Sequence, residues 1–215
     1  IKKSKILENK ALTESIKEIG ETLNSKSDNS NYKFKFYIVK DDQVNAFALP
    51  GGYVVVYTGL LKKAESPEEV AGVLAHEIQH VYQRHGLKRI VKRFGISLSI
   101  ALLFGDVGGT VDAIGGELAG LKFDRDEERE ADKLGLDLMY NSGIDPNGMV
   151  KFFKKLKETE IGLPNALSLI STHPDTEERI KNLQAMIDDR YRINYKIKKE
   201  FKFDWKKLKE EAEKF

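Results

Sequence analysis

The chain of 215 residues contains no cysteine. This absence excludes disulfides, thiolate metal ligands and a cysteine nucleophile, and it leaves His, Asp and Glu to hold any metal. An excess of charge of one sign is also lacking, because 36 basic residues stand against 34 acidic ones. No global field therefore draws the chain to nucleic acid, and we expect no nucleic-acid partner.

Long apolar runs are missing as well. The most apolar stretch, residues 94–104, is about half of the roughly 20 residues that a helix needs to cross a bilayer. We therefore expect no membrane span, while peripheral membrane association stays open. The sequence begins at Ile1 without an initiator methionine, which suggests a mature or trimmed product from which a targeting segment could have been removed.

Hydrophobic periodicity predicts a mainly helical α+β fold. Residues 5–23 have helical spacing, whereas residues 33–40 alternate and residues 53–57 are rich in β-branched and aromatic side chains, which is typical of strands. We expect one catalytic domain over residues 1–190 and a basic, aromatic extension over residues 191–215 that packs on the domain or trails it. Further helices are predicted at 66–85, within 87–120 where glycines break the pattern, at 124–142, at 145–159 and after Pro174.

The best-marked of these helices begins at Ser66. Ser66, Pro67 and Glu69 supply an N-cap, a proline in the first turn and a capping box. We expect the helix to end near His85, because Gly86 suits a left-handed C-cap.

A His-Glu-x-x-His pentapeptide lies on this helix. His76 and His80 are four residues apart on one face, so both imidazoles can reach one Zn²⁺. Glu77 lies about 100° round the helix, where it can take a proton from the attacking water without binding the metal. The pentapeptide alone has an alternative interpretation, in which both histidines are ordinary surface residues of a helix. His85, about 140° from His80, is interpreted as a contact to the helix end and not as a ligand.

A catalytic zinc needs a third protein ligand and an open position. Glu128 is the candidate, and Asp132, four residues further on, is expected to accept a hydrogen bond from a ligand histidine. Glu130 lies about 200° from Glu128 and is expected to face away. A solvated acidic face is the alternative for this segment, and the upstream pentapeptide weighs against it. The pattern predicts one zinc ion per chain.

Four segments, in the same order along the chain, resemble a known family. They are HEIQH at 76–80, EREAD at 128–132, NAFALPGGYVVVYTGLL at 45–61 and STHPDTEERI at 171–180. Together they resemble the zinc metallopeptidases that include CAAX prenyl endopeptidases, HtpX-like heat-shock proteases and bacterial periplasmic quality-control peptidases. The resemblance implies a zincin-like domain with a small sheet beside the pentapeptide helix. It also implies the ligands His76, His80 and Glu128, with Glu77 as the catalytic base.

The resemblance implies one further site residue, His173, and a location, and Arg179, six residues after His173, is a second candidate. His173 lies where related enzymes carry a histidine near the metal, so it would stabilise the oxyanion or latch the fourth zinc position, with a packing role as the alternative. Arg179 would orient an acidic side chain near the metal or a substrate carbonyl, or be an ordinary surface arginine. The lack of a membrane span favours the soluble or peripheral branch, whose members act in the bacterial periplasm or cell envelope.

The strand that follows Pro50 is expected to bind substrate. An extended peptide can add to a free strand edge through backbone hydrogen bonds, and the alternative is a purely structural strand. The residues expected to present this edge are Gly52, Tyr53, Val54, Val55 and Val56. Paired glycines at 108–109 and 115–116 predict a mobile lid or a plain loop.

The sequence thus predicts a zinc-dependent endopeptidase that hydrolyses extended or unfolded polypeptide. An alternative of another class is a zinc-containing, chaperone-like module that binds peptides without turnover because His173 latches the site. Residues 191–215 interleave basic and aromatic side chains, which favours packing over contact with anionic lipid or nucleic acid.

Overall fold

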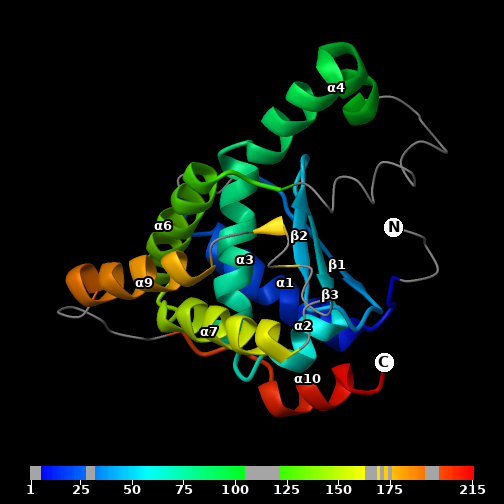
Figure 1. Cartoon of the computed structure of the whole chain (residues 1–215). Coiled ribbons are helices and arrows are strands. Elements are labelled where there is room, and N and C mark those ends of the chain that lie inside the picture. Colours follow the sequence, from blue (N-terminus) through cyan, green and yellow to red (C-terminus); the bar gives the residue numbers. More distant parts are fainter. Residues whose placement is uncertain are drawn as a thin grey trace.

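Helix α3 (Pro67–Tyr82) runs through the middle of the molecule in the computed structural model (Figure 1). A three-stranded sheet lies on one side of it, and α6 (Arg125–Asn141), α7 (Asn147–Gly162) and α9 (Thr176–Met186) lie on the other. The predicted class, a mainly helical α+β fold with a small sheet beside the pentapeptide helix, is confirmed. The structure describes residues 6–27, 32–104, 122–162, 169, 172–173, 176–191 and 199–215.

The sheet contains β1 (Lys35–Val39), β2 (Ala46–Leu49) and β3 (Tyr53–Tyr57) in the order β1-β3-β2. β3 pairs with β1 in parallel and with β2 in antiparallel orientation. β1 and β3 were predicted, whereas β2 was missed. Because β3 is the middle strand, both of its edges are paired. The prediction that this segment presents a free edge is therefore wrong for its whole set, Gly52, Tyr53, Val54, Val55 and Val56.

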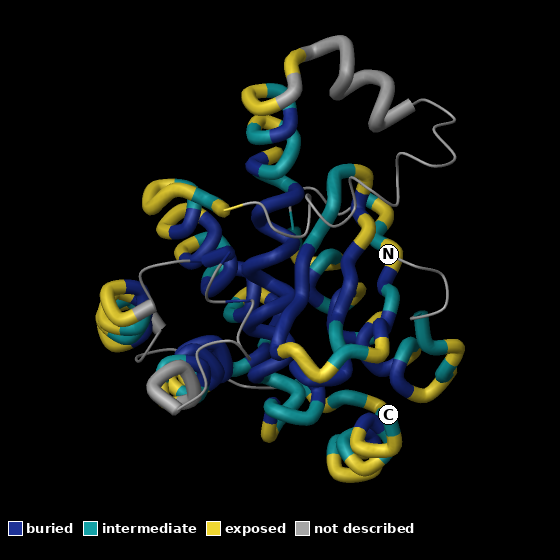
Figure 2. Tube along the Cα trace, turned by 45° about the vertical axis from the view of Figure 1, so that its right-hand side comes forward, coloured by how far each residue is buried: buried dark blue, intermediate teal, exposed yellow. Residues whose placement is uncertain are grey.

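Side chains of the strands alternate between two apolar clusters. One face of the sheet joins the main core against the helices, and the other face forms a small separate cluster. This period of two is what extended backbone imposes. The buried residues concentrate in α3 and its neighbours (Figure 2). The strand residues in the main core are Phe36, Ile38, Ala46, Val54 and Val56, and those in the small cluster are Val39, Phe47 and Val55.

Helix α1 (Lys10–Asn24) begins later than periodicity predicts. The side chain of Asn9 accepts a hydrogen bond from the backbone N–H of Leu12 at 3.0 Å and so caps the helix. Ile6, which has helical spacing in the sequence, instead forms a β-bridge with Val39. The start at residue 5 is wrong because a side-chain cap and a strand contact outweigh the apolar pattern.

Helix α3 begins after Ser66, as predicted, but it ends at Tyr82 and not near His85. The left-handed conformation expected at Gly86 falls on Arg84, with φ 58°. The turn around Arg84 lets a new helix, α4 (His85–Phe104), start at once. α4 has a non-helical residue at Gly95 and projects from the body of the molecule (Figure 1).

The later helices follow their caps. α6 starts with a capping box between Asp124 and Glu127 and ends at the C-cap Ser142. Gly143 then has φ 69°, as a left-handed end requires. The predicted lid and its paired glycines lie outside the described residues. The remaining described elements are α2 (Thr58–Lys63), the π-helical turn η3 (Ile187–Tyr191) and α10 (Trp205–Ala212).

Helix α10 is part of the main core although it lies in the predicted C-terminal extension. Leu208 is 4% exposed and Ala212 is fully buried, and both join the main core. Lys209 donates a hydrogen bond to the carbonyl oxygen of Ala64 at 3.1 Å. The described part of the extension therefore packs on the body of the molecule. None of the described helices has both the length and the apolarity needed to cross a membrane.

Candidate metal centre

Four side chains from separate segments converge on one point. His76 and His80 come from α3, Glu128 from α6 and His173 from the segment before α9. One nitrogen or oxygen atom from each lies within 4.8 Å of the others. All four side chains are buried, with 4% exposure or less. The structure thus brings the three predicted ligands together and adds His173 as a fourth donor.

The donor atoms have the spacing of a metal coordination sphere. In a tetrahedral site with ligands about 2.0–2.1 Å from zinc, neighbouring donors lie roughly 3.3 Å apart. His76 Nε2 lies 2.9 Å from His80 Nε2, 3.1 Å from His173 Nδ1 and 3.5 Å from Glu128 Oε2. Glu128 Oε2 has no aligned hydrogen bond within the described residues. Buried nitrogen and oxygen donors at this spacing fit a divalent cation such as zinc.

Asp132 and Arg179 support the site from behind His76. Asp132 Oδ1 lies 2.9 Å from His76 Nδ1, and Arg179 donates two hydrogen bonds of 2.7 Å to the Asp132 carboxylate. Burial raises the pKa of Asp132, but the Arg179 charge and hydrogen bonds outweigh it and lower the pKa to about 2. An ionised Asp132 can hold the Nδ1–H of His76, which directs the Nε2 lone pair into the site.

Charge balance also holds Glu128 and His80 in forms that bind metals. Burial raises the pKa of Glu128, but His173 and His76 lower it more, so the pKa falls well below its usual range. Arg179 Nη1 adds an ion pair with Glu128 Oε2 at 2.6 Å. Burial, together with His76, lowers the pKa of His80 far below its usual range. A carboxylate and a neutral imidazole are the protonation states that a metal requires.

Glu77 lies beside the four donors without belonging to them. It is 2% exposed, and its Oε2 accepts a hydrogen bond from the backbone N–H of Ala48 in β2 at 3.1 Å. Its Oε1 has no hydrogen-bond partner among the described residues and lies 3.4 Å from His173 Nε2. Burial raises the pKa of Glu77 above that of an ordinary carboxyl group. Such a group is suited to taking up and releasing a proton.

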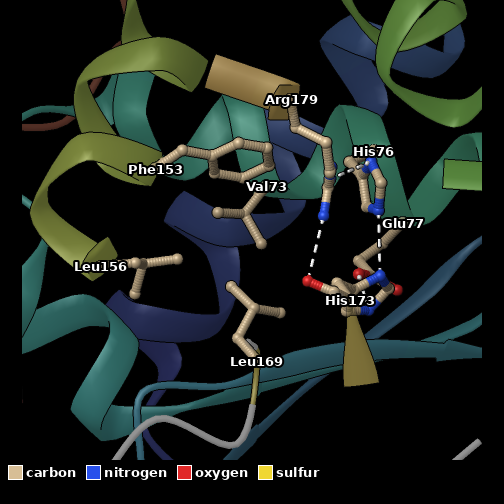
Figure 3. A pocket seen from close by; sticks show the side chains of 8 residues that line it. All are labelled: Val73, His76, Glu77, Phe153, Leu156, Leu169, His173 and Arg179. Atoms are coloured by element: carbon tan, nitrogen blue, oxygen red, sulfur yellow. Dashed lines mark hydrogen bonds and ion pairs between the residues drawn. The ribbon is translucent and has the colours of Figure 1, made fainter. Parts of the chain in front are cut away.

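A narrow apolar hollow opens beside His76 and Glu77 (Figure 3). Arg179 borders it, with its guanidinium 4.7 Å from the centre of the Phe153 ring. Arg179 Nη1 also donates a hydrogen bond to the carbonyl oxygen of His173 at 3.3 Å. The apolar side chains that line this hollow are Val73, Phe153, Leu156 and Leu169.

A second hollow lies along β2, on the side of His80. Tyr53 lines it and is 39% exposed, so it is the one predicted substrate residue that lines either hollow beside the site. Val54, Val55 and Val56 are buried in the sheet. Other residues that line the second hollow are Tyr32, Ala48, Pro50, Tyr82 and Arg84.

Sequence reasoning missed three side chains around the site. His85, expected to contact the helix end, places Nδ1 at 3.0 Å from His80 Nδ1. Glu130 is half exposed and lies outside the group of four donors, as expected, but its Oε2 lies 3.1 Å from His85 Nε2, a contact that was not predicted. The Phe123 ring stacks on the His80 ring at 3.9 Å between centroids. One signal for His85 was available, because the chain has 4 histidines and all of them gather here.

Comparison with known proteins agrees with this geometry. The family model of Peptidase family M48 matches residues 10–187. The beta-barrel assembly-enhancing protease of Yersinia pestis is 32% identical over 80% of this chain and 38% of its own length. The mitochondrial metalloendopeptidase OMA1 of Schizosaccharomyces pombe is 31% identical over 74% of this chain and 48% of its own length.

A shorter relative aligns over more of its length. Metalloprotease LoiP of Escherichia coli is 31% identical over 81% of this chain and 69% of its own length. The chain spans less than two fifths of the first relative, so that match covers only part of the larger protein. The resemblance to zinc metallopeptidases seen in the sequence is confirmed, and the chain belongs to Peptidase family M48.

Proposed function

We propose that this chain is the catalytic domain of a zinc-dependent endopeptidase that hydrolyses extended or unfolded polypeptide. The observation that carries the proposal is the group of four buried donors with the Glu77 carboxylate beside it. Membership of Peptidase family M48 and the names of the metalloprotease relatives support it. One zinc ion per chain would be held by His76, His80 and Glu128.

Each residue of the site has a part in this chemistry. Zinc bound here would polarise the scissile carbonyl and lower the pKa of the attacking water. Glu77 takes the proton of that water on Oε1 and passes it to the leaving amine. Oε1 suits this role because it has no hydrogen-bond partner within the described residues. Asp132 and Arg179 keep His76 and Glu128 in the orientation and charge state that binding needs.

The polypeptide would bind along the outer edge of β2. In the described part of the chain β2 pairs on one side, with β3. The N–H of Ala48 points away from β3 to Glu77, so β2 leads directly to the catalytic base. Backbone pairing at such an edge tolerates many sequences. The hollow around Tyr53 and Ala48 would then accept part of the bound polypeptide beside the metal.

His173 is proposed to act as a latch in the conformation seen here. Its Nδ1 lies 2.8 Å from Glu128 Oε1 and 3.1 Å from His76 Nε2, where a fourth ligand would sit. A catalytic zinc needs that position open for water. Substrate binding would therefore have to displace His173. Once displaced, its ring could donate to the developing oxyanion, which was the other role considered.

The same observation favours a second candidate function. If the latch never opens, the chain would be a zinc-containing module that binds peptides along β2 without cleaving them. This candidate predicts tight zinc and peptide binding and no cleavage by the natural chain, whereas a His173→Ala variant should gain cleavage because the blocked position is freed. The endopeptidase predicts cleavage by the natural chain. Faster cleavage by His173→Ala would then assign His173 to the latch, and slower cleavage would assign it to stabilisation of the oxyanion.

We propose a polypeptide substrate and a place in the bacterial periplasm or cell envelope, with peripheral membrane association left open. The name of one relative connects that protein with β-barrel assembly.

The decisive test combines zinc content with cleavage of an unfolded protein. Glu77→Gln is expected to keep zinc near one ion per chain and to slow cleavage by about 10²–10⁴-fold, because the general base is lost. Glu158→Gln, on the exposed face of α7, is the matched control and should cleave normally. Full cleavage by a zinc-loaded Glu77→Gln protein would refute the mechanism. Absence of zinc binding by the natural chain would refute the metal site itself.

A further inference from the structure

His85 is a buried histidine that the proposed mechanism does not use. It is 1% exposed and opens α4, directly after the left-handed turn at Arg84. Its Nδ1 lies 3.0 Å from His80 Nδ1, and its Nε2 lies 3.1 Å from Glu130 Oε2. The imidazole thus stands between a proposed zinc ligand and a carboxylate, with one ring nitrogen directed at each.

Metal binding by His80 would determine which ring nitrogens of His80 and His85 carry hydrogen. The donor set uses His80 Nε2, which lies 2.9 Å from His76 Nε2 and 3.5 Å from Glu128 Oε1. A neutral imidazole that gives Nε2 to a metal carries its hydrogen on Nδ1. His80 therefore donates to His85 Nδ1. His85 must then carry its own hydrogen on Nε2, and it donates that hydrogen to Glu130.

In both histidines of α3 the ring nitrogen that faces away from the donor group is connected to a carboxylate, directly for His76 and through His85 for His80. His76 Nδ1 faces the Asp132 carboxylate directly at 2.9 Å. His80 Nδ1 reaches a carboxylate only through His85, and the Glu130 side chain is 50% exposed whereas that of Asp132 is 3% exposed. Glu130 and Asp132 both come from α6, so one helix supplies the terminal acceptor for both ligands.

The turn that ends α3 makes this contact possible. On a continuous helix His85 would lie about 140° from His80 and point elsewhere. Because α3 ends at Tyr82 and Arg84 takes φ 58°, the backbone turns and brings the His85 ring back to His80. The Phe123 ring stacks on the face of the His80 ring, at 3.9 Å between centroids and 26° between planes. His80 is thereby fixed at its edge and at its face.

We propose that His85 and Glu130 form a positioning relay for His80, which fixes the tautomer and ring orientation that metal binding needs. The inference rests on the proposed zinc site. His85 touches neither metal nor substrate in this role, so it is a positioning residue. Hydrogen-bond partners of metal ligands commonly change metal affinity or activity by about 10–100-fold when they are removed.

The test measures zinc affinity by competition with a chromogenic chelator, and the visible absorption of the cobalt-substituted protein. His85→Leu is expected to weaken zinc binding by about 10–100-fold and to change the cobalt spectrum, because the His80 ring is no longer held. His85→Gln should restore most of the affinity, since its amide can accept from His80 and donate to Glu130. A purely structural role would not predict that rescue.

A second variant keeps the inference testable if His85→Leu does not fold. Glu130→Ala removes a half-exposed side chain and is expected to fold, to weaken zinc binding by several-fold and to alter the cobalt spectrum in the same direction. Asp126→Asn, an exposed carboxylate of α6 that pairs with Arg129, is the matched control and should change neither measurement.

The outcomes separate this inference from the proposed function. Zinc affinity within twofold of the natural chain and an unchanged cobalt spectrum, for folded His85→Leu or for Glu130→Ala, would overturn the relay and leave the endopeptidase proposal intact. Failure of the natural chain to bind zinc would overturn the zinc site and, with it, the relay. Loss of cleavage with unchanged zinc affinity in both variants would also overturn the relay, because its action through His80 would be absent.

Discussion

The two halves of α3 are buried to the same degree but are held by different forces. In the first half, Val70, Ala71, Val73 and Leu74 are at most 1% exposed and belong to the main core. In the second half, the polar side chains of His76, Glu77, Gln79 and His80 are at most 6% exposed. Burial of the apolar half is favourable in itself, whereas burial of the polar half is favourable only when each polar group finds a partner.

This difference separates position from chemistry along one helix. The apolar half packs closely on α7, which fixes where the helix lies. The polar half is completed by charged side chains from α6 and α9, chiefly Asp132, Glu128 and Arg179. We therefore expect changes near the polar half to depend strongly on bound metal, and changes in the apolar half to depend on packing alone.

The largest effect on stability is expected from Arg179→Met in the metal-free protein. Arg179 is 4% exposed and neutralises two buried carboxylates, those of Asp132 and Glu128. Its loss removes the guanidinium from both carboxylates, and removing one partner from a buried ion pair costs about 3–5 kcal/mol. Urea unfolding in the presence of a chelator measures the loss. Zinc should recover part of it, because a bound cation supplies the missing positive charge.

The control for this variant is Arg129→Met. Arg129 pairs with Glu178 at the surface, where both side chains are nearly half exposed. Arg129→Met should therefore lose at most about 1 kcal/mol relative to the natural chain, and this loss should be the same with and without zinc. A loss below about 1 kcal/mol for metal-free Arg179→Met would contradict the view that buried charge governs the polar half.

The site residues of the polar half were predictable because their pairing follows from short-range spacing in the sequence. His76 and His80, and Glu128 and Asp132, are pairs at four-residue spacing on well-capped helices, so their shared faces follow from the helical period. The contact between His80 and His85 could not be predicted in this way. It depends on a backbone turn at Arg84, and a helical wheel assumes that no such turn exists.

The order of the strands was also beyond the sequence pattern. β2 reads Ala-Phe-Ala-Leu and lacks β-branched residues, so its propensity for strand is weak. Its place at the edge arises from antiparallel pairing with β3, which is a long-range property. Missing β2 made β3 look like an edge strand, although β3 is the middle strand of the sheet. The fold class was predictable because helix caps and strand alternation are local.

A smaller effect is expected in the apolar half from Gly72→Ala. A Cβ at Gly72 would lie 2.5 Å from Met149 Cα, closer than two carbon atoms can approach, so α3 and α7 would have to separate. Alanine favours a helix by about 1 kcal/mol over glycine, but overpacking costs about 1–3 kcal/mol. Because the close contact is with the Met149 backbone, the overpacking cost should lie at the upper end of that range. We therefore expect a net loss of about 2 kcal/mol in urea unfolding, equal with and without zinc.

Gly86→Ala is the matched control for that variant. A Cβ there would meet only Pro50 at 3.9 Å, an ordinary contact, so the change should be neutral or slightly stabilising. If Gly72→Ala were as stable as Gly86→Ala, close packing would not fix the position of α3. If its loss disappeared with zinc, the two halves of the helix would not be independent.

The smallest effect is expected from Ser66→Ala at the start of α3. The Ser66 hydroxyl accepts a hydrogen bond from the backbone N–H of Glu69 at 3.4 Å, a long contact, so its loss should cost about 0.5–1 kcal/mol. Ser66→Asp keeps a capping acceptor and should retain the stability. His76 lies ten residues further on, roughly 15 Å along the axis, so zinc affinity should not change. Weaker zinc binding by folded Ser66→Ala would mean that the first turn reaches the metal centre, and the division of α3 into a half for position and a half for chemistry would have to be abandoned.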